Sequence, residues 1–217
     1  MTDKMELHIA ELLRRYPELA SLREDLSAAY SLLERCYESG GKLLVAGNGG
    51  SAADSEHIAG ELMKRFRLRR PVSAEFAEKL CRIDPVCGRE LSEQLECGLP
   101  AIPLVGMEAL STAVINDVSG LGVFAQQLFV LGQPGDVFFA ISTSGNSRNV
   151  LYAAAVAKAK GMPILALTGG SGGELAKLAD VNLCVPEKET YKIQELHLPV
   201  YHCLCLMLEE HFYGEAE

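Results

Sequence analysis

The chain has 217 residues, of which 48% are hydrophobic and 23% charged, a composition typical of one compact globular domain rather than a disordered or fibrous protein. Lys and Arg number 20 against 29 Asp and Glu, which leaves a formal net charge of -9. This balance argues against a broad electrostatic surface for nucleic acid or a membrane. A phosphate group would therefore have to be bound locally.

Membrane spans and disulfides are not expected either. No apolar run approaches the roughly 20 residues that cross a bilayer, and residues 1–6 are charged without an apolar signal core behind them. Cytoplasmic localisation is therefore predicted. The seven cysteines include no CxxC pair, which favours reduced thiols. Cys81, Cys87 and Cys97 fall in one segment, but their spacing matches no metal-ligand pattern, so incidental thiols are the preferred interpretation.

The first 40 residues are predicted to be helical. Apolar residues recur there at three- and four-residue intervals from about Leu7 to Tyr37, with a break near Pro17. Five short apolar runs follow, and their continuous apolarity indicates strands that are buried on both faces. They are residues 42–47, 101–105, 136–141, 163–167 and 181–185. Helical patterns cover residues 51–66, 120–131, 149–160, 174–178 and 193–212.

Strands alternating with helices predict an α/β fold, a three-layer sandwich in which helices flank a five-stranded parallel sheet. One domain covering residues 1–217 is expected. Residues 73–100 interrupt the alternation and are interpreted as an inserted helical segment on the surface.

Two loops follow predicted strands, at the edge where parallel sheets bind ligands. The first, which we call the glycine loop, is Gly47-Asn48-Gly49-Gly50-Ser51, and its glycines allow close approach of a ligand to the backbone. It also fits the G-x-G-x-x-A form of the dinucleotide fingerprint. The acidic residue that should end a second strand about twenty positions on is missing, which disfavours a nicotinamide site.

The second loop, the hydroxyl loop, is Ser142-Thr143-Ser144-Gly145-Asn146-Ser147. It offers four hydroxyl groups, and Ser147 is a natural helix N-cap. Hydrogen bonds and helix polarity there suit the monoester phosphate of a sugar. A capped turn of small residues is the alternative interpretation.

Three further positions carry side chains that suit a site. His57 and Glu61 lie four residues apart and should share one helix face, where they could bind a divalent metal or form a simple surface pair. On the last predicted helix, His197 is interpreted as a packed histidine, whereas His202 is open to either interpretation. Asn116 and Asp117 suit either a polar pocket or the start of a turn.

Together, the glycine loop, the hydroxyl loop and Gln194-Glu195-Leu196-His197, in this order, resemble the sugar-isomerase (SIS) domain family, and within it the phosphoheptose isomerases. The similarity covers the chain apart from residues 73–100. It implies an aldose-ketose isomerase that interconverts sedoheptulose 7-phosphate and D-glycero-D-manno-heptose 7-phosphate through an enediolate. It also implies a divalent metal, usually zinc, and a homotetramer with sites at subunit interfaces.

Carried over by position, the resemblance assigns roles to individual residues. The implied metal ligands are His57, Glu61, Gln194 and His202, and the implied acid/base pair is Glu61 and His202. The implied substrate-binding residues are Asn48, Gly49, Gly50, Asn116, Asp117, Ser142, Thr143, Ser144, Ser147 and Gln194. Arg65 lies where the family has a basic residue beside the pocket.

One point of geometry remains open. Gln194 and His202 are eight residues apart, which is about 12 Å along an unbroken helix. Three arrangements are compatible with this spacing: one metal within reach of both side chains, one ligand supplied by a neighbouring subunit, or a helix bent at Pro199.

Two alternatives stand beside this prediction. A non-catalytic SIS protein of the DnaA-initiator-associating type would act through protein contacts, but a candidate ligand at all four metal positions favours an enzyme. An isomerase for another phosphosugar is the second alternative.

Overall fold

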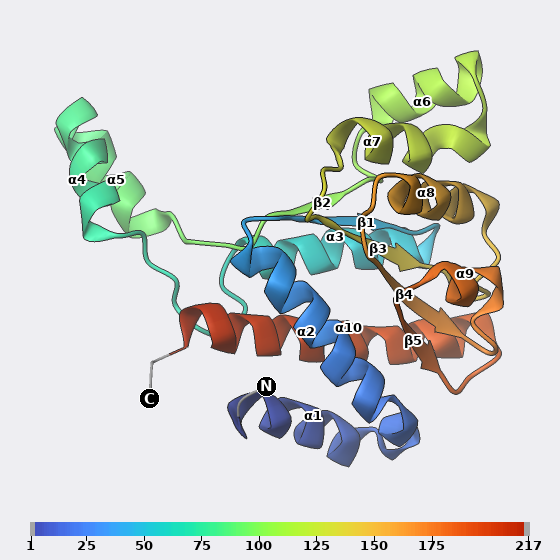
Figure 1. Cartoon of the computed structure of the whole chain (residues 1–217). Coiled ribbons are helices and arrows are strands. Elements are labelled where there is room, and N and C mark those ends of the chain that lie inside the picture. Colours follow the sequence, from blue (N-terminus) through green and yellow to red (C-terminus); the bar gives the residue numbers. More distant parts are fainter. Residues whose placement is uncertain (1–2, 215–217) are drawn as a thin grey trace.

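The computed structural model describes residues 3–214, so residues 1–2 and 215–217 of the predicted domain lie outside the described part. Five parallel strands form one sheet in the order β2-β1-β3-β4-β5 (Figure 1). The strands are β1 Leu43–Ala46, β2 Ala101–Pro103, β3 Val137–Ile141, β4 Ile164–Gly169 and β5 Val181–Val185. The predicted three-layer α/β class is confirmed.

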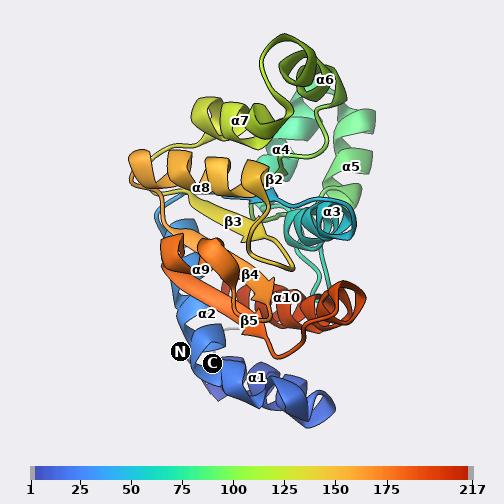
Figure 2. The ribbon, with the colours of Figure 1, turned by 90° about the vertical axis from the view of Figure 1, so that its right-hand side faces the viewer.

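Each face of the sheet is covered by its own helices (Figure 2). Val45 and Phe139 point into a core shared with α1, α2, α3 and α10, whereas Leu44 and Phe138 point into a second core with α7, α8 and α9. This alternation buries both faces of the sheet, which explains the continuous apolar runs in the sequence.

The helices on the first face are α1 Asp3–Arg15, α2 Arg23–Glu38, α3 Gly50–Met63 and α10 Thr190–Tyr213, with the 3-10 helix η1 Pro17–Leu22 between α1 and α2. Those on the other side are α6 Glu108–Asp117, η2 Gly120–Gly122, α7 Val123–Leu131, α8 Arg148–Ala159 and α9 Gly173–Leu178. Pro199 lies inside α10, which continues as one helix.

Two elements differ from the sequence prediction. The strand predicted to end at 105 ends at Pro103, at the edge of the sheet, where the Leu104 N–H still donates to the Val45 carbonyl of β1 at 2.8 Å. Helix α6 was not predicted, since only Val114 of its residues is buried and no apolar stripe reveals it. Asn116 and Asp117 consequently end a helix and do not begin a turn.

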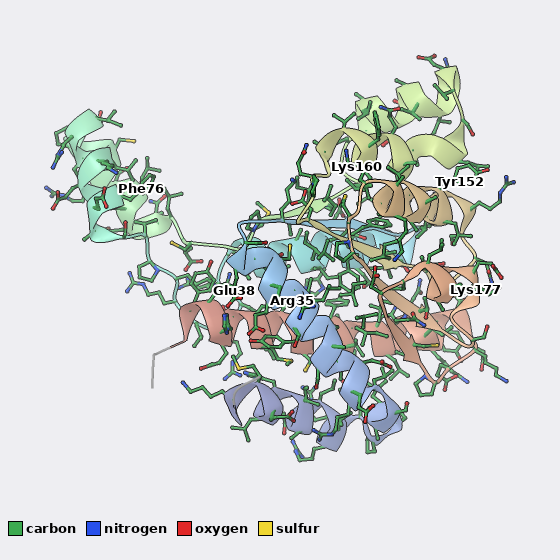
Figure 3. The ribbon with its side chains drawn as sticks, viewed as in Figure 1. Arg35, Glu38, Phe76, Tyr152, Lys160 and Lys177 are labelled. Atoms are coloured by element: carbon green, nitrogen blue, oxygen red, sulfur yellow. The ribbon has the colours of Figure 1, made fainter. Side chains whose placement is uncertain are left out.

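Residues 73–100 contain two short helices, α4 Ala74–Ile83 and α5 Pro85–Gln94. They pack on each other as a hairpin that projects from the body of the molecule (Figure 1). Its large apolar side chains include Phe76, Ile83 and Val86, which are exposed, and Phe76 lies on the projecting part in Figure 3.

No helix within residues 3–214 combines the length and apolarity needed to cross a membrane.

Candidate active site

The glycine loop connects β1 to α3 and lies against α10. Gly49 has a φ of 58° and a ψ of -119°, a conformation that side-chain-bearing residues rarely adopt. A Cβ on Gly50 would lie 2.5 Å from Nε2 of Gln194. The backbone conformation therefore favours glycine at position 49. The absence of a side chain at Gly50 lets the Gln194 amide of α10 lie directly against the start of α3.

The glycine loop is joined to the helix that follows the hydroxyl loop. Asn48 and Asn149 exchange two side-chain hydrogen bonds of 3.0 and 2.8 Å. These residues are 101 positions apart in the chain. The two loops that the sequence singled out are thus neighbours at the carboxyl edge of β1 and β3.

The hydroxyl loop is held partly by its own side chains. Ser142 Oγ donates to Ser147 Oγ at 3.1 Å, and Ser144 Oγ accepts from the backbone N–H of Asn146 at 3.2 Å. Ser147 occupies the N-cap position of α8, as predicted, although its side chain accepts no hydrogen bond from a backbone N–H of the helix. The Ser147 hydroxyl instead accepts the hydrogen bond from Ser142.

A cluster of histidine and glutamate lies between α3 and α10. His57 Nε2 is 3.1 Å from Glu61 Oε1, and the ring centroids of His57 and His202 are 5.0 Å apart. Phe66 covers His202 with its ring at 5.2 Å. Glu61 Oε2 and His202 Nε2 are both buried without a hydrogen-bond partner. Two buried polar atoms without hydrogen bonds in one cluster suit a bound ligand.

Two residues that the sequence analysis missed complete this cluster. His57 Nδ1 is 2.9 Å from the Tyr201 hydroxyl, and that hydroxyl donates to Asp54 Oδ1 at 3.2 Å. Asp54 lies three residues before His57, one helical turn away, and Tyr201 precedes His202. Their closeness in sequence to His57 and His202 was the one feature from which the sequence analysis could have identified them.

Burial perturbs two ionisable groups here. It raises the pKa of Asp54, against the hydrogen bond from Tyr201, which lowers it. It also lowers the pKa of His202, and the neighbouring imidazole of His57 acts in the same direction. The neutral imidazole of His202 is thereby favoured, which is the form that binds metal or accepts a proton.

The donor set of this cluster fits a divalent cation. Imidazole nitrogen and carboxylate oxygen are zinc ligands. Glu61 Oε2 and His202 Nε2 accept no hydrogen bond, and the only ion pair of Glu61 Oε2 among the described residues is with Lys64 Nζ at 3.8 Å. The ligand atoms of Glu61, His202 and His57 do not all approach within 4.8 Å of one another. Within residues 3–214, only one set of His, Cys, Asp and Glu atoms does so, that of Glu34, Glu38 and His211.

Gln194 lies apart from His202 along α10. It packs on Gly50, and α10 is unbroken between the two residues despite the buried Pro199. The axial separation is therefore about 12 Å, as in a regular helix.

The remaining predicted residues lie outside the cluster. The side chains of Asn116 and Asp117 are exposed at the end of α6, where the amide of Asn116 donates to Asp117 Oδ1 at 2.8 Å. Arg65 pairs with Glu96 at 3.3 Å, near the base of the α4–α5 hairpin. Thr143 accepts from the backbone N–H of Gly169 through its carbonyl oxygen.

A cavity of about 390 Å³ opens beside His202, between α1 and α10. His8, Arg15 and Arg67 line it, and sequence reasoning did not identify them. Its volume is in the range of small-molecule sites. The hydroxyl loop contributes no residue to its wall. Within one chain, this cavity therefore does not connect the hydroxyl loop with the cluster of His57, Glu61 and His202.

Two buried interactions fix α10 beneath the site. His197 is fully buried and bonds to the Thr168 carbonyl at 3.2 Å, which confirms it as a packed histidine. Glu209 accepts from the backbone N–H groups of Phe66 and Arg67, each at 2.8 Å, and pairs with buried Arg70 at 2.9 Å. The second interaction holds the segment that places Phe66 on His202.

The chain matches the SIS domain in two parts, over residues 8–80 and residues 114–207. It is 37% identical over 218 residues to a phosphoheptose isomerase from Alkalilimnicola ehrlichii, covering 99% of this chain and 98% of the relative. A second relative of that name, from Thiobacillus denitrificans, is 43% identical over 189 residues, covering 86% of this chain and 83% of the relative.

Solved structures show the same similarity. A phosphoheptose isomerase from Francisella tularensis superposes with a TM-score of 0.75 at 33% identity, covering 97% of this chain and 100% of that one. The enzyme from Neisseria gonorrhoeae gives 0.71 at 33% identity, covering 96% and 98%. The chain therefore belongs to the phosphoheptose isomerase family of SIS-domain proteins.

Proposed function

We propose that this protein is an aldose-ketose isomerase that interconverts sedoheptulose 7-phosphate and D-glycero-D-manno-heptose 7-phosphate. The relatives named above support the reaction. The observation that carries the proposal is the buried cluster in which Glu61 Oε2 and His202 Nε2 each lack a hydrogen-bond partner, with the Lys64 ammonium 3.8 Å from Glu61 Oε2.

Isomerisation moves a proton between C1 and C2 of the sugar through an enediolate, so one group must remove the proton and one must return it. Glu61 and His202 are assigned these roles. The lowered pKa of His202 supports its role, because a neutral imidazole can accept a proton near pH 7. The apolar ring of Phe66 lies 5.2 Å from the His202 ring and packs on it.

His57, Glu61, Gln194 and His202 are the proposed ligands of a divalent metal, with zinc as the expected ion. When bound, such an ion supplies positive charge that stabilises an enediolate. The separation of Gln194 from His202 along α10 leads us to propose that a neighbouring subunit completes the site.

The phosphate is assigned to the hydroxyl loop and the start of α8. Ser142, Thr143, Ser144 and Ser147 supply hydroxyl groups there, and the helix N-terminus supplies positive polarity. Asn48, Gly49, Gly50, Asn116, Asp117 and Gln194 are the remaining proposed substrate contacts.

We infer a cytoplasmic homotetramer with sites at subunit boundaries. The exposed apolar side chains of the α4–α5 hairpin support assembly, since large apolar residues on a projecting element are costly in water. The separation of the hydroxyl loop from the cavity at His202 also favours a pocket that two subunits share. Sedimentation of a fully active monomer would contradict this arrangement.

The DnaA-initiator-associating type is not favoured, because the relatives that cover nearly the whole chain are isomerases. An isomerase for another phosphosugar remains the alternative to test.

The deciding experiment measures turnover of sedoheptulose 7-phosphate and a panel of other ketose phosphates, before and after chelation and zinc restoration. Turnover of the heptose with loss on chelation supports the proposal, whereas preference for another ketose identifies a different substrate. His202→Ala should abolish turnover with the oligomer intact. Ser144→Ala with Ser147→Ala should mainly raise KM, and an unchanged KM would remove the phosphate assignment.

A further inference from the structure

Asp54, Tyr201 and His57 form a hydrogen-bonded series beneath the proposed metal ligands. The Tyr201 hydroxyl contacts Asp54 Oδ1 at 3.2 Å and His57 Nδ1 at 2.9 Å. Asp54 and His57 come from α3, whereas Tyr201 comes from α10. Tyr201 is only 1% exposed, so its hydroxyl is held within the protein interior.

The direction of donation follows from the chemistry of each group. An ionised carboxylate can only accept, so the single proton of the Tyr201 hydroxyl goes to Asp54. The Tyr201 oxygen then accepts from His57, which places a proton on Nδ1 of that ring. In the neutral imidazole, the lone pair is consequently on Nε2.

The Nε2 lone pair faces an acceptor. Nε2 of His57 lies 3.1 Å from Glu61 Oε1, and with the proton on Nδ1 these two atoms suit a cation that both would bind. The other oxygen of Glu61 and Nε2 of His202 are buried nearby without a hydrogen-bond partner, and the Lys64 ammonium lies 3.8 Å from that oxygen of Glu61. The series therefore directs the ligating nitrogen of His57 toward Glu61 and His202, with which it would share a divalent cation.

We propose that Asp54 and Tyr201 are positioning residues that fix the Nδ1–H tautomer of His57 and so hold Nε2 ready for a divalent metal. The inference rests on the proposed function, since it concerns the same metal. Metal-binding histidines commonly donate their second N–H to such a partner, and loss of that partner lowers metal affinity roughly 10- to 100-fold.

The first measurement is the affinity for Zn²⁺, determined by competition with a chelating dye. Tyr201→Phe removes only the hydroxyl and should weaken Zn²⁺ binding about 10- to 100-fold. All proteins carry His211→Gln, because Glu34, Glu38 and His211 form a second set of possible ligands. Tyr37→Phe is the matched control, since it removes a buried hydroxyl that contacts the Pro100 carbonyl and should leave the affinity unchanged.

The second measurement tests whether the two residues act in series. Asp54→Asn keeps an oxygen that accepts from Tyr201 and should bind Zn²⁺ nearly as well as the parent. Asp54→Leu removes the acceptor and should match Tyr201→Phe. The double variant Asp54→Leu/Tyr201→Phe should be no weaker than either single variant, because each change breaks the same series.

The third measurement is the ¹⁵N NMR spectrum of histidine-labelled, zinc-loaded protein. The parent should show a His57 Nδ1–H that exchanges slowly with solvent, and Tyr201→Phe should make that exchange fast. A purely structural role for Tyr201 would lower the melting temperature without these changes.

Three results would overturn the proposal: unchanged Zn²⁺ affinity in Tyr201→Phe, additive losses in the double variant, or ligation of zinc through Nδ1. Each is independent of turnover. Suppose that the Zn²⁺ affinities of the parent and its variants differ as expected, but the parent does not isomerise the heptose phosphate. The proposed function then fails and the positioning role stands. If the parent turns over the heptose phosphate but the Zn²⁺ affinities of the variants do not differ as expected, only the positioning role fails.

Discussion

Replacing His197 by Gln should remove a pH dependence of stability that the structure predicts. His197 is fully buried, and burial lowers its pKa from 6.5 to about 4, against the bond to the Thr168 carbonyl, which raises it. Above pH 6.5 the ring is neutral in both the folded and the unfolded chain. As the pH falls below 6.5, the unfolded chain binds a proton that the folded chain refuses, so stability is lost.

The magnitude follows from the two pKa values. Relative to pH 7.5, the wild-type protein should lose about 1.4 kcal/mol at pH 5.5 and about 2.5 kcal/mol at pH 4.5 from this histidine alone. Gln at position 197 does not titrate, and its amide can donate to the Thr168 carbonyl. The other ionisable groups are common to both proteins, so their contributions cancel in the difference.

The assay is urea unfolding of both proteins at several pH values between 7.5 and 4.5, at one protein concentration. The free energy of unfolding of the wild type should fall faster with acid than that of His197→Gln. A difference between the two proteins that stays constant across this range would refute the reasoning, because His197 would then titrate equally in both states.

Two further substitutions test the packing around the site. Gly50→Ala should displace the Gln194 amide, since the new Cβ would lie 2.5 Å from its Nε2; we expect reduced turnover with an unchanged melting temperature, and full activity would show that Gln194 moves freely. Glu209→Gln should cost about 3–5 kcal/mol in urea unfolding, because it leaves the buried charge of Arg70 without its partner. Glu11→Gln is its control, since the exposed ion pair of Glu11 with Arg14 should contribute less than about 1 kcal/mol. Equal losses of unfolding free energy in the two variants would contradict the expected difference between a buried and an exposed ion pair.

Local patterns were enough to predict the fold class and much of the site's outline. Five apolar runs predicted five strands because both faces of a parallel sheet are buried. The pairing of His57 with Glu61 followed from a four-residue spacing on one helix. The glycine and hydroxyl loops were identified because each follows a strand and begins a helix.

Contacts between distant segments could not be predicted in this way. Tyr201 meets His57 across 144 positions, and Asn48 meets Asn149 across 101. Arg70 ends a run of basic residues that suggests an exposed surface, yet it is 1% exposed and paired with Glu209.

The sequence by itself determined which segments become strands and helices and which loops lie at the carboxyl edge of the sheet, because those properties depend on neighbours a few residues away. Only the tertiary structure decided which side chains of α3 and α10 meet, which of their polar atoms stay unpaired, and which charges are buried. Those outcomes depend on how two helices pack on one sheet face, which no local spacing encodes.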